Sequence, residues 1–157
     1  GKHLHPTFQL SFMMAPPDFI AESRKYVSML NPQGNFVLEQ ALGEMIAEGD
    51  LFRYQKKALK IYQERMLCFE VLLTQYFGTS IHFEKPRNGF AFWIEFKEHI
   101  SLTKLAQELK SRAIFLPRIC MYHNKKQIAL RLGFAHWNLE EMQEFMILFK
   151  ESYEAIR

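Results

Sequence analysis

Apolar side chains recur every three or four positions through most of the first half of the chain, which is the spacing of an amphipathic helix. They predict three helices, over residues 18–30, 36–48 and 50–77. Gly49 and Gly78 follow the second and the third, and a glycine is well suited to end a helix. Asp50 is expected to cap the longest of the three, which extends to about Phe77.

Alternation of apolar and polar residues predicts strands in other parts of the chain. Residues 8–14 alternate and then become fully apolar, which predicts a strand. Four more strands are predicted in the second half, at residues 81–84, 89–96, 114–117 and 128–132. Helices are predicted over 101–110 and 138–156, and Asn138 and Glu141 have the spacing of a capping box at the start of the last one.

This order of elements predicts an α/β (α+β) chain in which a small, mostly antiparallel sheet carries helices on one face. The strand predicted at residues 8–14 does not fit that unit, because one strand cannot form a sheet alone. We therefore expect it to belong to a larger sheet, and the chain to be a fragment of a longer protein.

Composition agrees with a compact protein. The 157 residues are 48% hydrophobic and include 15 Phe, which is enough for a sizeable core and argues against disorder. The net charge is +3 and no run of basic residues stands out, so the sequence does not indicate a surface that binds nucleic acid. No apolar stretch reaches the roughly 20 residues of a membrane helix. Cys68 and Cys120 form no CxxC pair, which favours two core thiols in a reducing cytoplasm.

Two segments near the ends of the chain carry the most specific signal. Residues 1–17 are GKHLHPTFQLSFMMAPP, and residues 128–136 are IALRLGFAH. In this order they resemble the cofactor-lysine segment and the substrate-carboxylate arginine segment of fold-type I aminotransferases, which use pyridoxal 5′-phosphate (PLP). They look most like the aminotransferase-like domain of MocR/GntR-type transcriptional regulators, which often have Gly-Phe-Ala-His where this chain has residues 133–136.

The resemblance implies that Lys2 is the lysine that forms a Schiff base with the PLP aldehyde. Taken alone, Lys2 also fits an ordinary solvated lysine. Gln9 stands where the family usually has an arginine on the cofactor phosphate, and a neutral amide offers no charged bidentate contact. Gln9 leaves three possibilities: weak or absent PLP binding, a phosphate held by groups upstream, or a strand residue with no ligand role.

Arg131 interrupts an apolar strand, where it shares a face with Ala129 and Gly133. An arginine beside small residues suits a groove that admits a carboxylate, held by two parallel N–H···O bonds. The resemblance implies that this position binds the carboxylate of an amino-acid substrate or effector. The alternative is a structural salt bridge, for example to Glu95 on a neighbouring strand.

Other positions match the family less specifically. Tyr62 and Arg65 match its Tyr-x-x-Arg stretch on the long helix, where we expect packing and interdomain contacts. Gly89 fits either a close approach of the backbone to a substrate or a plain turn. His136 is expected at the entry to the last helix. The histidines provide no metal-ligand set.

The resemblance implies a division into three parts: residues 1–49 as the end of a large PLP-binding domain, 50–78 as a long interdomain helix, and 79–157 as the aminotransferase small C-terminal domain. The remaining cofactor contacts and a winged-helix DNA reader would lie upstream, and the family forms homodimers. The expected function is the sensing of an amino-acid-like molecule by a cytoplasmic regulator. A true PLP-dependent aminotransferase and a PLP-free dimerisation domain are the alternatives, and residues 1–157 alone are expected to be inactive.

Overall fold

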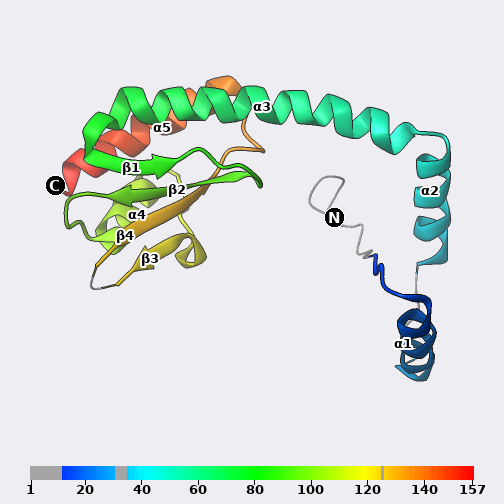
Figure 1. The fold of residues 1–157 in the computed structure, drawn as a ribbon. Helices are drawn as coiled ribbons and strands as arrows, with labels where there is room; N and C mark the ends of the chain where they lie inside the picture. The colour runs from blue at the N-terminus through cyan, green and yellow to red at the C-terminus, as the bar shows by residue number, and fades with distance from the viewer. Residues whose placement is uncertain (1–11, 31–34, 125) are drawn as a thin grey trace. The chain divides into compact units, whose positions relative to one another are not determined.

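The computed structural model describes residues 12–30, 35–124 and 126–157 (Figure 1). The chain divides into two compact units, Gly1–Leu59 and Lys60–Arg157, and each is described by itself. The strand predicted at residues 8–14 lies mostly outside the described residues, and its described part, residues 12–14, is not in a strand.

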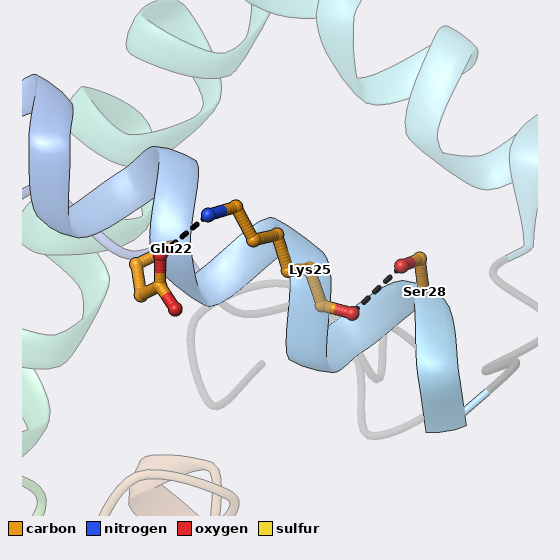
Figure 2. A network of polar contacts seen from close by, with 3 residues as sticks. All are labelled: Glu22, Lys25 and Ser28. Atoms are coloured by element: carbon orange, nitrogen blue, oxygen red, sulfur yellow. Dashed lines mark hydrogen bonds and ion pairs between the residues drawn. The ribbon is translucent and has the colours of Figure 1, made fainter.

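The first unit contains the helix α1 (Pro17–Leu30), which begins at a proline because the first turn of a helix needs no N–H there. Figure 2 shows its polar contacts: Lys25 Nζ donates to the Glu22 carboxylate at 2.8 Å, and Ser28 Oγ donates to the Lys25 carbonyl oxygen at 2.7 Å. The ion pair is more than half exposed, so it stabilises the helix by only about 0.5 kcal/mol. Within the described structure α1 has no buried residue.

The helix α2 (Phe36–Ala47) begins after Asn35, whose side-chain oxygen accepts from Leu38 N at 3.1 Å. Gly49 ends it with a φ of +76°, a backbone angle that favours glycine. The long helix α3 (Asp50–Phe77) follows at once, as the hydrophobic pattern predicted. Asp50 lies inside its first turn and pairs with Arg53.

The second unit is built on a four-stranded, fully antiparallel sheet in the order β1-β2-β4-β3. Its strands are β1 (Ile81–Glu84), β2 (Ala91–Phe96), β3 (Met121–His123) and β4 (Ile128–Gly133). Short 3-10 turns, η1 (Gly78–Ser80) and η2 (Arg118–Cys120), precede β1 and β3. The helices of this unit are the end of α3, α4 (Leu102–Ser111) and α5 (Leu139–Ala155), whose Asn138 and Glu141 form the predicted capping box.

One strand was placed wrongly. Residues 114–117 were predicted as a strand from their apolar side chains, but they form an irregular segment, and the strand is β3, which starts at Met121. Pro117 has no N–H to give to a ladder, and the η2 turn follows it directly. Ile114 and Leu116 of this segment are half-buried and pack against the core, but they do not pair as a strand.

The core lies between one face of the sheet and the helices α3, α4 and α5 (Figure 1). Phe92 on β2 is fully buried and its ring lies 5.4 Å from Phe69 of α3, measured between centroids. Phe96 stacks on Tyr153 of α5 at 5.5 Å. Each such side chain contributes roughly 1.5–3 kcal/mol by leaving water. The fold class predicted from the sequence, a small antiparallel sheet with helices on one face, is confirmed.

No described helix combines the length and the apolar character that are needed to cross a bilayer. Both cysteines are free and half-buried, and Cys68 packs against the core as predicted, whereas Cys120 is not among the residues that form or contact the core. Burial raises the pKa of the Cys68 thiol, and the Glu64 carboxylate raises it further. The thiol is therefore protonated and weakly reactive at neutral pH.

Candidate functional site

Arg131 lies on β4, in the middle of the sheet, and points to the face that the helices leave open. Its neighbours Leu130 and Leu132 are buried in the core, so the pleat of the strand places Arg131 on the opposite side. The side chain is exposed. Directly across the ladder it faces Trp93 of β2.

Arg131 forms no ion pair or hydrogen bond with any other described residue. The alternative partner, Glu95, is engaged elsewhere: it accepts from Trp93 Nε1 at 2.9 Å and from the Gln127 side-chain amide. The structural salt bridge between Arg131 and Glu95 is therefore absent from the described structure. An exposed guanidinium without a partner keeps its five donors available to a ligand.

An aromatic pair covers one side of Arg131. The rings of Trp93 and Tyr122 lie 4.5 Å apart between centroids, and they reach each other across Ala129, which pairs with Tyr122 and is fully buried. The sequence predicted that Ala129 and Gly133 would both line an open groove. Because Ala129 is covered, the open side of Arg131 is the one towards Gly133, which pairs with Ala91.

The turn before β2 lies beside this open side. Gly89 has a φ of +90°, and a Cβ built on it would meet no atom within 4 Å. The backbone angle itself therefore favours a glycine here, as a turn requires. Phe90 ends the turn, and its carbonyl oxygen accepts from Phe134 N at 3.0 Å, immediately after β4.

The helix α3 fixes both segments that flank the open side of Arg131. The ring of Tyr62 lies 4.6 Å from that of Phe90, and Arg65 donates a hydrogen bond to the carbonyl oxygen of Ala135. The packing role expected of Tyr62 and Arg65 is seen here. These two contacts attach the turn before β2 and the segment after β4 to the same helix.

His136 follows Ala135 in the chain and is exposed, and its ring lies 4.8 Å from that of Trp137, measured between centroids. It precedes the Asn138 cap, as expected for a histidine at the entry to a helix.

Lys2 and Gln9, the two candidate cofactor residues, lie outside the described residues, so the structure does not place them with Arg131. The described residues contain no group of three side chains that could hold a metal ion.

The surroundings of Arg131 were only partly accessible to sequence reasoning. Period-two alternation places Trp93 and Glu95 on one face of their strand, but it does not give the register that sets Trp93 opposite Arg131. The aromatic pair with Tyr122 was missed because β3 was placed too early in the chain.

No protein-family profile matches the chain. Three curated transcriptional regulators are similar to it. It is 19% identical over 158 residues to the probable rhizopine catabolism regulatory protein MocR of Rhizobium meliloti, covering 99% of this chain and 32% of that protein. It is 24% identical over 151 residues to the HTH-type regulator YdfD of Bacillus subtilis, covering 92% of this chain and 30% of that protein. With the HTH-type regulator YjiR of Escherichia coli, 27% identity extends over 71 residues, 45% of this chain and 15% of that protein. The chain thus spans a third or less of their length.

Solved structures with the same fold include aminotransferases. The kynurenine aminotransferase of Pyrococcus horikoshii superposes with a TM-score of 0.72 at 14% identity, over 88% of this chain and 35% of that one. The α-aminoadipate aminotransferase LysN of Thermus thermophilus superposes with a TM-score of 0.73 at 13% identity, over 90% of this chain and 37% of that one. At these identities the likeness establishes the fold alone. The chain therefore has the fold of the C-terminal part of a fold-type I PLP aminotransferase-like domain, and its sequence is similar to MocR/GntR-type transcriptional regulators.

Proposed function

We propose that the chain is the C-terminal part of the aminotransferase-like effector domain of a MocR/GntR-type regulator, and that it takes an amino-acid-like ligand by its carboxylate. Similarity to three regulators supports the first part of this proposal, and the aminotransferase fold supports the second. The same proposal includes the division of the chain into the end of a large domain (residues 1–49), an interdomain helix (50–78) and a small C-terminal domain (79–157). A regulator of this kind acts in the cytoplasm, where its DNA is.

The observation that carries the proposal is the state of Arg131. A guanidinium usually pairs with a protein carboxylate when one is near, yet Glu95 is bonded to Trp93 and Gln127 instead. Arg131 is thereby free to bind a ligand carboxylate through two parallel N–H···O bonds. Gly133, two residues along the same strand, is exposed and has no side chain to obstruct a ligand at Arg131.

PLP is the cofactor that this fold implies. Among the aminotransferases with this fold, the structure of LysN is complexed with N-(5′-phosphopyridoxyl)-L-leucine. In this chain Lys2 supplies the amine that would hold the aldehyde, whereas Gln9 offers neutral donors where a charged contact to the phosphate is usual. When bound, PLP would supply an electron sink for chemistry on an amino acid. Catalysis is not required for this proposal, because a sensor needs only to bind.

The partners follow from the same proposal. DNA would be contacted through a separate N-terminal domain, as the HTH-type relatives suggest, and the protein would act as a homodimer. Exposed apolar side chains on the first unit support packing against a further protein surface, since Phe19 of α1 and Phe36 of α2 are 58% and 73% exposed. Gln9 favours one rival function, a PLP-free domain used only for dimerisation.

A PLP titration of the full-length gene product separates these functions. We expect the absorbance band of lysine-bound cofactor, its loss in Lys2→Ala, and tighter binding in Gln9→Arg, where a charged phosphate contact is restored. His3→Ala, next to Lys2, serves as the control and should keep the band. A band unchanged by Lys2→Ala would refute the role of Lys2, and the absence of PLP binding in every variant would favour the dimerisation domain.

A ligand-dependent change in DNA affinity distinguishes a regulator from an enzyme. The full-length gene product should change its affinity for its own promoter when the twenty common amino acids are added one at a time. Turnover of an amino acid with a 2-oxo acid, without any change in DNA binding, would contradict the regulator and support an aminotransferase.

A further inference from the structure

A second recess lies on the other side of the sheet from Arg131. It runs between α4 and the segment that returns along that helix, with a volume of about 720 Å³, and its lining residues are Thr103, Ala106, Gln107, Lys110, Phe115, Leu116, Arg118 and Met121. Met121 pairs with Leu130, whose side chain points into the core, so the recess opens on the helix side at the edge strand β3. We call it the α4 groove.

The α4 groove is positively charged. Lys110 and Arg118 form no ion pair with any other described residue, and no acidic side chain is among the residues that line the groove. Thr103 and Gln107 lie one turn apart on α4 and add a hydroxyl and an amide. Two cations and two neutral hydrogen-bonding groups are a donor set that suits an anion.

The remainder of the lining is apolar. Ala106, Leu116 and Met121 are half-buried, and the small Ala106 leaves room between the helix and the returning segment. Phe115, at the edge of the groove, is 79% exposed. A ligand with an apolar body would cover this ring and remove it from water.

The shape of the groove depends on how α4 ends. Ala113 has a φ of +63°, and the bonds Ile114 N to Leu109 O at 2.9 Å and Ala113 N to Lys110 O at 3.1 Å form a Schellman motif. This turn reverses the chain, and Pro117 and η2 continue it in a fixed direction. Backbone hydrogen bonds therefore hold the returning segment at its start and, through Cys120 N to Pro117 O at 2.9 Å, at η2.

We propose that the α4 groove binds a small amphipathic anion: a carboxylate or a phosphate monoester joined to an apolar chain or ring. Its size favours a small molecule over a protein segment, because Thr103 to Lys110 spans only about 10 Å along the helix, and its volume lies within the roughly 300–1,000 Å³ of ligand pockets. The groove is separate from Arg131, so it would be a second ligand site and does not rest on the proposed function.

The test is an NMR titration of the ¹⁵N-labelled 157-residue chain with 4-phenylbutyrate and with phenyl phosphate. We expect amide shifts in the lining of the groove with both anions, and weaker or no shifts there with the uncharged 4-phenylbutanol. Lys110→Gln and Arg118→Gln should each raise the Kd about threefold, and the double variant about tenfold, as expected for exposed charge pairs. Ala106→Leu, which fills the floor without a change of charge, should also weaken binding.

Two variants serve as controls. Lys104→Gln removes a cation from the same helix outside the groove, and Arg131→Gln removes the other candidate anion site; neither should change the Kd. Thermal unfolding of each variant establishes that it is folded. An equal effect of Lys104→Gln, equal binding of 4-phenylbutanol, or the absence of shifts in the groove would each overturn the proposal. So would binding of an acidic peptide where the two small anions fail.

Discussion

The hydrogen bond from Arg65 to the carbonyl oxygen of Ala135 attaches the segment after β4 to α3, and its removal gives the most informative change in stability. Arg65→Met keeps most of the apolar stem and removes the guanidinium donors. A bond from a charged donor is worth about 1.5–3 kcal/mol when buried. Both residues are half-buried, so water replaces part of the loss, and we expect the free energy of unfolding to fall by about 1 kcal/mol.

For a unit of this size, 1 kcal/mol lowers Tm by about 4–8 °C. The chain has two tryptophans, Trp93 and Trp137, and both belong to the second unit, so their fluorescence reports the unfolding of that unit alone. Arg87→Met is the matched control, because Arg87 is exposed and forms no hydrogen bond or ion pair with the other described residues. Equal Tm values for Arg65→Met and Arg87→Met would refute the reasoning.

Three further changes test the fold. Phe92→Ala opens a cavity in the aromatic core and should cost about 3–5 kcal/mol in urea unfolding; a loss below about 1 kcal/mol would contradict the packing. Ala113→Gly relieves a left-handed backbone angle and should stabilise the unit by about 0.5–1 kcal/mol; a lower Tm would show that the turn is not strained. Burial raises the pKa of Tyr153, and Glu98 raises it further while Arg157 lowers it. The stability that the neutral phenol provides is therefore present below the unfolded pKa of about 10 and is lost as the pH rises through the folded value. In a spectrophotometric titration Tyr153 should ionise at a higher pH than the exposed tyrosines, and its ionisation together with them would contradict this.

Local signals in the sequence predicted the helices well, because their ends are encoded by single residues. Asn138 with Glu141 forms the capping box that its spacing indicated, and Ser101 caps α4 through a bond to Lys104 N. Gly49 ends α2 with a positive φ. Each of these features depends on residues within four positions of one another, which is the range that a sequence pattern describes directly.

Pairing across the sheet was less accessible, because it depends on residues far apart in the chain. β3 has only three residues and lies at an edge, so its own sequence gives little indication of a strand. The more apolar stretch at residues 114–117 was chosen instead, although Pro117 cannot donate to a ladder. The bond from Gln127 to Glu95 has the same origin, because the register of β2 and β4 brings these two distant residues together. With Glu95 engaged in this way, Arg131 has no partner among the described residues.

The central claim is that Arg131 binds the carboxylate of an amino-acid-like ligand, and calorimetry on the full-length gene product tests it most directly. The twenty common amino acids are screened first, and any that binds is compared with its carboxamide. The account predicts that Arg131→Gln weakens binding of the acid by about tenfold or more, with no loss of Tm because Arg131 has no partner in the described structure, and that Arg87→Gln does neither. The carboxamide should bind the wild-type protein and Arg131→Gln equally. Equal affinity of the acid for the wild-type protein and Arg131→Gln would contradict the account.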